Sequence, residues 1–536
     1  MRRTERSTSN VQLPTSKEEP SPCPLPAYRE RVRHAGINVV LVGFLVSLAV
    51  LIGLVVLLMR EKKGGSTASA QPLMVYCAAG LREPMQAAAD EYQKEFGVEV
   101  RCSFGASQAE LVTLERAGNG DLYLPADESY IEIARQKGLV DAVMPVAIQR
   151  PILGVRKGNP KGIKLLDDVL KSDVKLGQAN PDAAAIGKVT RDALTKAGKW
   201  EPVKAKTVVF TGTVNEVANA IKVGSIDCGF VWDALVKQYP DLEGVEISEL
   251  KDVKSSVAVV VLKTSKNGVE ARRLARYLSA RDRGLKQFQR FGFTTVEGDA
   301  WSLRPELKLM SGAMLRPAIE ETISNFERRE GVSVTRVYNG CGILVAAMRA
   351  GERPDAYFAC DQSFMKQVND LFMDATDVSQ NQLVILVHKG NPRGVHALKD
   401  LAQKDLKVGV GHEKQCALGV LTKETLVQTK QYEPVMKNVV VQSPTGDFLV
   451  NQLRTGSLDA VIAYVSNAAA SGDKLEAIRI DIPCAIATQP IAVGKESSQK
   501  QLAGRLLEAI KSAESKEKFL ENGFYWKSED SRVGRR

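Results

Sequence analysis

The feature that most constrains this 536-residue chain is an internal repeat of about 230 residues. The segment VNEVANAIKVGSID at 214–227 is matched 232 positions later by GDFLVNQLRTGSLD at 446–459. The same offset relates VRKGNP to VHKGNP, and an offset of 234 aligns the segments further upstream. Repeats of about 20–50 residues indicate solenoids or propellers. This much longer unit therefore predicts a duplicated globular domain.

Strand-like and helix-like patterns alternate within the first copy. Short apolar runs are followed by amphipathic segments that are long enough for helices. We predict strands at 73–79, 98–104, 121–127, 174–178, 206–212 and 228–232, and helices at 81–97, 105–118, 128–138, 183–198 and 213–224. This alternation is typical of βαβ units, so we expect an α/β fold with parallel sheets in both copies.

Four of the predicted strands run into their helices through small or hydroxyl-bearing residues. These turns are Ala78–Gly80, Gly105–Ser107, Ala183–Ala185 and Thr211–Thr213. Ligands of open α/β sheets bind beyond the carboxyl ends of the strands, where helix starts direct unpaired N–H groups at them. A single turn of this kind is common and indicates no ligand. Four such turns in each copy predict an anion site that needs no cationic side chain.

The N-terminal region contains a predicted membrane anchor. Residues 37–59 carry no charge and are long enough to span a bilayer as one transmembrane helix. Residues 1–36 are polar, Pro-rich and basic, so we expect a disordered cytoplasmic leader. Residues 60–72 read as a flexible linker to modules on the extracytoplasmic side. Cleavage near Ala70 is the alternative to anchoring.

The net charge of +10 lies mainly at the two ends of the chain. Residues 1–63 hold ten Lys and Arg against five Asp and Glu. The last ten residues, which include a basic tail at 529–536, hold four against two. Because the repeats carry little of the excess, we expect no nucleic-acid partner.

Nothing in the sequence predicts an enzyme or a cofactor. The chain has four histidines, none of them in the first copy, and no sequence motif of a nucleophilic, metal-dependent or nucleotide-binding site. Asp127 and Asp361 end equivalent strands, and we interpret them as structural. The eight cysteines do not align between the copies, so we expect mostly buried thiols rather than a duplicated disulfide framework.

Each copy is similar to the periplasmic molybdate- and tungstate-binding proteins of ABC importers. The first copy carries the matching motifs CAAGL, SFGASQ, DLYLPAD, GTVNEVANAIKVGSIDCGFVW and FQRFGF. The resemblance implies two tandem modules of the type II periplasmic-binding-protein fold, each with two α/β lobes around a cleft. We place module 1 at 73–300 and module 2 at 306–528.

The resemblance also implies ligand-binding positions. In module 1 they are Gly80, Ser107, Ala185 or Ile186, Val214 and Trp232, and in module 2 they are Met314, Cys341, Leu418, Gly446 and Tyr464. Ser107 keeps one of the family's two oxyanion-binding serines, whereas Gly80 replaces the other and has no hydroxyl. Module 2 keeps neither serine. The resemblance therefore supports the family's fold for this chain more strongly than the family's ligand.

Two features are particular to this chain. Arg82 and Arg316 occupy equivalent positions beside the implied sites, where each is either a solvated side chain or a guanidinium for a carboxylate or a larger oxyanion. Cys341, Cys360 and Cys416 are expected near the cleft of module 2. They are either inert buried thiols, a ligand set for a soft metal, or a redox pair.

The sequence thus predicts a membrane-anchored substrate-binding protein. It would capture a molybdate-like oxyanion and deliver it to the permease of an ABC importer. The alternative is an extracytoplasmic sensor or scaffold that binds a carboxylate-bearing anion or, in module 2, a soft metal through cysteines.

Overall fold

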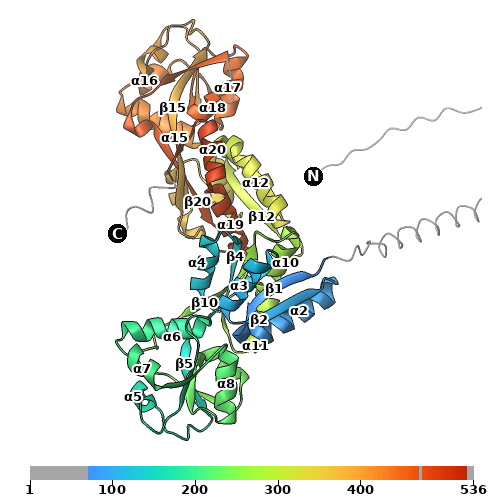
Figure 1. Cartoon of the computed structure of the whole chain (residues 1–536). Helices are drawn as coiled ribbons and strands as arrows, with labels where there is room; N and C mark the ends of the chain where they lie inside the picture. Colours follow the sequence, from blue (N-terminus) through green and yellow to red (C-terminus); the bar gives the residue numbers. More distant parts are fainter. Residues whose placement is uncertain (1–70, 470–473, 528–536) are drawn as a thin grey trace, which may run out of the picture. The chain divides into compact units, whose positions relative to one another are not determined.

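The computed structural model describes residues 71–469 and 474–527, in which the repeated sequence folds into two modules (Figure 1). Each module consists of two α/β lobes. The predicted leader, transmembrane helix and basic tail, and nearly all of the predicted linker, lie outside the described residues. No helix in the described ranges is long and apolar enough to cross a membrane.

The first lobe of module 1 has a six-stranded sheet in the order β11-β4-β10-β3-β1-β2. Its strands are β1 (Leu73–Ala78), β2 (Val100–Gly105), β3 (Leu122–Leu124), β4 (Val140–Gln149), β10 (Ser255–Leu262) and β11 (Thr294–Thr295). Its helices are α2 (Arg82–Phe96), α3 (Ser107–Ala117), α4 (Glu128–Gln136), α10 (Gly268–Leu278) and α11 (Gly284–Arg290). The strands β1 and β3 are almost fully buried, which explains their nearly continuous apolar sequences.

The second lobe of module 1 has a five-stranded sheet in the order β7-β6-β8-β5-β9. Its strands are β5 (Pro151–Arg156), β6 (Leu176–Ala179), β7 (Thr207–Thr211), β8 (Cys228–Trp232) and β9 (Leu242–Val245). Its helices are α5 (Leu166–Val169), α6 (Ala185–Lys196), α7 (Trp200–Lys206), α8 (Val214–Val223) and α9 (Asp233–Gln238). The chain passes between the lobes twice, at Arg150 and over 246–254.

Module 2 repeats this order of elements, but its two lobes share one ten-stranded sheet. The 13-residue strand β15 (Thr376–His388) runs through both lobes where module 1 has the separate strands β4 and β5. The other strands are β12 (Glu306–Gly312), β13 (Ser333–Asn339), β14 (Ala356–Phe358), β16 (Val408–Gly411), β17 (Val439–Ser443), β18 (Ala460–Tyr464), β19 (Leu475–Arg479), β20 (Ile486–Val493) and β21 (Tyr525–Trp526). The helices are α12 (Arg316–Glu330), α13 (Cys341–Arg349), α14 (Gln362–Lys366), α15 (Ala417–Gln428), α16 (Tyr432–Met436), α17 (Gly446–Arg454), α18 (Val465–Ala469), α19 (Lys500–Ile510) and α20 (Ala513–Glu521).

The strands and helices predicted for the first copy are present, and the predicted parallel pairing is found in both sheets of module 1 but does not extend through all their strands. The strands β1, β2 and β3 are parallel, as are β6, β7 and β8. The strands β4, β10, β5 and β9 add antiparallel pairs. They flank the two passages of the chain between the lobes, so no crossover helix forces them into a parallel arrangement.

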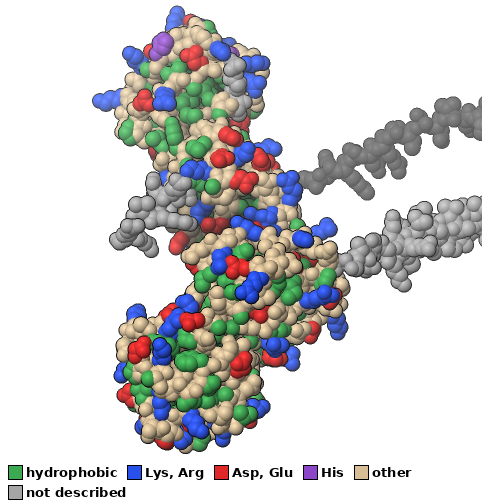
Figure 2. All heavy atoms as spheres, in the orientation of Figure 1, with side chains coloured by type: hydrophobic (Ala, Val, Ile, Leu, Met, Phe, Trp, Pro, Cys, Tyr) green, Lys and Arg blue, Asp and Glu red, His purple; other side chains and the backbone are tan. Residues whose placement is uncertain are grey.

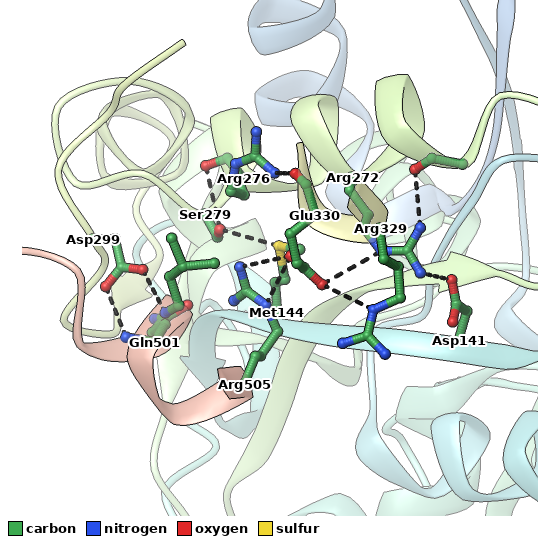
Figure 3. A network of polar contacts seen from close by, with 12 residues as sticks. Asp141, Met144, Arg272, Arg276, Ser279, Asp299, Arg329, Glu330, Gln501 and Arg505 are labelled. Carbon is green, nitrogen blue, oxygen red and sulfur yellow. Dashed lines mark hydrogen bonds and ion pairs between the residues drawn. The ribbon is translucent and has the colours of Figure 1, made fainter. Parts of the chain in front are cut away.

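The two modules meet through a buried polar cluster (Figure 3). Glu330, at the end of α12 in module 2, has no solvent exposure. Its carboxylate lies 3.4 Å from Arg272 Nε of module 1 and 3.3 Å from Arg505 of α19. Its backbone carbonyl accepts a hydrogen bond from Arg276, whose pKa is lowered to about 10 by burial. The modules are therefore joined by desolvated charges as well as by the chain that links them.

The segment between the modules is also held against module 2 by hydrogen bonds. The carboxylate of Asp299 accepts hydrogen bonds from the amides of Gln501 and Leu502, at 2.8 and 2.9 Å, and so satisfies the start of α19.

On the face drawn in Figure 2, acidic and basic side chains are interspersed over both modules.

Candidate functional site

A small cavity lies between the lobes of module 1. It is lined by Ala78, Ala79, Gly80, Ala106, Ser107, Ala126, Ala184, Ala185, Ile186, Thr213, Val214 and Trp232. The volume of the cavity is about 20 Å³. None of these described lining residues carries a charge. The cavity therefore fits a compact ligand of a few atoms.

All four predicted turns contribute to this cavity. The helices α3, α6 and α8 begin there, at Ser107, Ala185 and Val214, and the short 3₁₀ turn Ala79–Leu81 closes another side. Ala106 and Ala184 precede α3 and α6 and make no side-chain hydrogen bond to the helix starts. First-turn amides without an intrahelical acceptor thus point towards one small space, which is the arrangement that binds anions.

The start of α8 is organised differently from the other two. The hydroxyl of Thr213 accepts a hydrogen bond from the amide of Glu216 at 3.3 Å. The carboxylate of Glu216 accepts one from the amide of Gly212 at 2.9 Å. This N-cap uses the amide of Glu216 and leaves that of Val214, the first helical residue, for a ligand.

Ser107 and Gly80 face the cavity from the first lobe. The Ser107 side chain is 1% exposed, and its Oγ accepts a hydrogen bond from the amide of Ala126 at 3.2 Å. A Cβ atom on Gly80 would lie 3.1 Å from Val214 Cγ1 and 3.6 Å from Trp232 Cδ1 of the second lobe. The missing side chain at Gly80 therefore lets the lobes approach each other closely.

The lobes of both modules are joined by the same main-chain bond. In module 1 the amide of Gln108 donates to the carbonyl of Ala183 at 3.0 Å. In module 2 the amide of Gly342 donates to the carbonyl of Gln415 at 2.9 Å. These residues align in the repeat, so both modules are described with their clefts closed.

The two arginines beside the sites are stacked on aromatic rings. The guanidinium carbon of Arg82 lies 4.3 Å from the centre of the Phe104 ring, and that of Arg316 lies 5.5 Å from the centre of the Tyr338 ring. Arg82 is not among the residues that line the cavity. The structure thus places its guanidinium on the Phe104 ring and outside the lining of the cavity.

The cleft of module 2 contains sulfur where that of module 1 has small side chains. Cys341, Cys360 and Cys416 align with Ser107, Ala126 and Ala184, all of which line the cavity of module 1. All three cysteines are buried free thiols. The amide of Cys360 donates to Cys341 Sγ at 3.0 Å.

The lobes of module 2 also approach more closely around α13. A Cβ atom on Gly340 would lie 2.5 Å from the carbonyl oxygens of both Gln415 and Pro444. Module 1 has Ala106 at this position, with a Cβ atom. Gly340 therefore permits a contact between backbones that module 1 does not make.

Of the remaining predicted positions of module 2, Met314, Leu418 and Tyr464 are buried, whereas Gly446 is partly exposed. Met314 is 7% exposed, Leu418 lies in the first turn of α15, and Gly446 begins α17. The hydroxyl of Tyr464 has no hydrogen-bond partner among the described residues. Burial raises the pKa of Tyr464 well above its usual value, and the nearby Cys360 adds to this effect.

The three cysteines are not arranged as a metal site within the described residues. The described ranges contain no group of three or more His, Cys, Asp or Glu side chains arranged to hold a metal ion. The thiol of Cys416 donates instead to the carbonyl of Ser443 at 3.5 Å, whereas Cys341 and Cys360 contact each other. In this structure Cys341 and Cys360 thus form a pair with the thiol of Cys416 nearby, and a soft-metal site in this cleft stays an untested prediction.

Asp127 and Asp361 are structural, as the sequence analysis interpreted them. Each caps the helix that follows it by accepting a hydrogen bond from a backbone amide, that of Ser129 at 2.9 Å and that of Ser363 at 2.8 Å. The sequence analysis missed Ala126, which precedes Asp127 and lines the cavity. Its position in the DLYLPAD motif is the signal that could have identified it.

Comparison with known proteins agrees with this architecture. A sequence profile described as bacterial extracellular solute-binding protein matches residues 73–294 and again 307–525. A binding protein of Haemophilus influenzae is 25% identical over 224 residues, covering 42% of this chain and 91% of that protein. The molybdate-binding protein ModA of Mycobacterium bovis is 24% identical over 221 residues, covering 40% of this chain and 83% of that protein.

Solved structures match single modules. The periplasmic molybdate-binding protein of Azotobacter vinelandii is 17% identical, with a TM-score of 0.36, and the match covers 41% of this chain and 98% of that one. The tandem resemblance to molybdate-binding proteins that the motifs indicated is confirmed by the two profile matches and the ModA relatives.

Proposed function

Because this chain belongs to the family of bacterial extracellular solute-binding proteins, with one match in each module, we propose that module 1 captures a small tetrahedral oxyanion of the molybdate type. The observation that carries the proposal is the uncharged cavity at the starts of α3, α6 and α8. Converging amides and helix dipoles stabilise an anion there without a counter-charge.

The size of the cavity supports a compact inorganic anion. Pockets for drug-sized organic ligands measure about 300–1,000 Å³, whereas the volume of this cavity is only about 20 Å³. A carboxylate-bearing ligand would also need a cationic partner to form a paired contact. Arg82 is the nearest candidate by sequence, and it is stacked on Phe104.

Module 2 is proposed to bind such an anion more weakly than module 1. Its Cys341 stands where module 1 has Ser107, and a thiol is a weaker hydrogen-bond donor than a hydroxyl. The close contact of Gly340 with Gln415 further reduces the room for a ligand in the closed cleft. The two modules would therefore differ in ligand, in affinity, or in both.

The proposed location is the outer side of the cytoplasmic membrane. Residues 37–59 would anchor the chain and residues 60–72 would tether the modules within reach of an ABC importer permease. Tethering raises the local concentration of a binding protein at its partner, which is the advantage of an anchor over release.

Calorimetric titration tests the proposed ligand. The full-length chain would be titrated with molybdate, tungstate, sulfate, phosphate and small carboxylates, alongside its Ser107→Ala variant. Loss of one hydrogen bond to a charged group costs about 1.5–3 kcal/mol, which is roughly a ten- to hundredfold rise in Kd. The matched Ser311→Ala variant removes a buried hydroxyl of β12 that donates to Gly312, outside the module 1 cavity. Tight binding of a carboxylate, with no response to molybdate, would favour the sensor or scaffold instead.

A further inference from the structure

The thiols of Cys341 and Cys360 form a close pair at the base of the module 2 cleft. The backbone amide of Cys360 donates a 3.0 Å hydrogen bond to Cys341 Sγ. Both sulfurs also lie against Gly312, where a Cβ atom would be 2.1 Å from Cys360 Sγ and 3.2 Å from Cys341 Sγ. The two thiols are therefore neighbours in the core, and a disulfide would bring their sulfurs to about 2.05 Å.

The environment of the pair distinguishes the two thiols. Cys341 is the first residue of α13, where the positive end of the helix dipole stabilises a thiolate. Burial opposes ionisation of Cys341, but hydrogen bonds from the thiol and the amide of Cys360 outweigh it and lower its pKa. The pKa of Cys360 is raised by its hydrogen bond to Cys341 and by burial. Cys341 lies at a helix start and its sulfur accepts a backbone amide, so it is the better placed of the two thiols to act as the nucleophile.

We propose that Cys341 and Cys360 are a reversible dithiol–disulfide pair built into the cleft of module 2. With hydrogen peroxide as the oxidant, the Cys341 thiolate attacks one oxygen and becomes a sulfenic acid, while hydroxide leaves. The sulfur of Cys360 then displaces the sulfenic hydroxyl, and its proton leaves with that oxygen as water. In sum, two thiols and one peroxide give one disulfide and two waters.

Closure of the cleft controls access to the pair. Cys341 is fully buried and Cys360 is 5% exposed. The bond between the amide of Gly342 and the carbonyl of Gln415 holds the second lobe against the start of α13. An oxidant reaches the sulfurs when this bond opens, so the oxidation rate should follow the fraction of open cleft. The oxidation state of the pair would then depend on whether the cleft of module 2 is closed.

Thiol mapping of the full-length chain tests the pair directly. The reduced protein is exposed to hydrogen peroxide, alkylated and digested, and the cross-linked peptides are identified by mass. We expect a link between Cys341 and Cys360 that dithiothreitol reverses. Cys341→Ser and Cys360→Ser should each abolish it, and Cys416→Ser should leave it intact. A link to Cys416, or oxidation of Cys341 to a sulfinic acid with no link, would overturn the proposal.

A second pair of variants tests control by closure without altering a thiol. A Cβ atom on Gly342 would lie 2.2 Å from the carbonyl oxygen of Lys414, so Gly342→Ala should hold the cleft open. Gly504→Ala makes the same change in α19, where no atom lies within 4 Å. We expect Gly342→Ala to speed disulfide formation roughly tenfold, since the lost bond and the contact together favour opening. Equal rates of disulfide formation in the two variants would show that closure does not control access to the pair. Thermal unfolding curves would check that both variants are folded.

Discussion

The amide of Gln108 in the first lobe of module 1 donates a 3.0 Å hydrogen bond to the carbonyl of Ala183 in the second lobe. Gly342 and Gln415 repeat this bond in module 2, although neither residue type is shared between the copies. A main-chain bond needs no particular side chain, so the closing contact survived duplication while the side chains around the clefts diverged.

The amide of Val214 is expected to bind the anion directly. Val214 is the first residue of α8, where proline is well tolerated, and its Val214→Pro variant removes the amide proton while keeping an apolar side chain. Thr213 before it is already extended, with φ −136° and ψ 160°, as a residue preceding proline requires. We expect Val214→Pro to raise the Kd for the anion about ten- to hundredfold by calorimetry. Val214→Ala, which keeps the amide, is the control and should bind nearly as the parent does.

Removal of Arg82 is expected to have little effect on the binding of a bare oxyanion. Its guanidinium is stacked on Phe104 and does not line the cavity, so it acts only through longer-range charge. We expect Arg82→Ala to change Kd by less than about tenfold, and the matched Arg316→Ala in module 2 to leave module 1 unaffected. A loss of about 2–5 kcal/mol in Arg82→Ala would instead indicate a paired carboxylate on the ligand.

Glu330 is expected to be the most sensitive residue of the contact between the modules. Its Glu330→Ala variant leaves the largely buried Arg505 without its carboxylate partner, while Arg272 keeps only Asp141, and we expect this to cost about 3–5 kcal/mol of unfolding free energy. Glu508, with a side chain that is 68% exposed and paired with Lys511, is the matched control, and its Ala variant should cost less than about 1 kcal/mol. Urea unfolding measures both. Similar losses in the two variants would mean that the cluster does not hold the modules together.

The modules are expected on the outer face of the cytoplasmic membrane. Protease added to intact spheroplasts should degrade residues 61–536 and spare a cytoplasmic marker protein, because the bilayer shields only the cytoplasmic side. Persistence of both modules would reverse the proposed topology. Recovery of the modules from the soluble fraction, with a new N-terminus next to Ala70, would show cleavage instead of anchoring.

Much of this architecture follows from the sequence alone. The repeat determines that there are two modules, and the alternation of apolar runs with amphipathic segments gives the elements of the first copy, because both signals are local. The turns Ala78–Gly80 and Gly105–Ser107 predicted helix starts around an anion, and the structure brings them together with the two other turns around one cavity. Neighbouring parallel strands end at the same edge of a sheet. A sequence that predicts such strands therefore also predicts that the turns after them lie close together.

Only the tertiary structure decided how distant side chains meet. Arg82 stacks on Phe104, Glu330 meets Arg272 of the other module, and Cys341 meets Cys360 while Cys416 turns to a backbone carbonyl. The antiparallel strands at the passages between the lobes were equally hidden from the sequence. Each of these contacts depends on how the lobes and modules pack against one another. No local sequence pattern encodes this packing, because it is set by the volumes and burial of side chains over the whole interface.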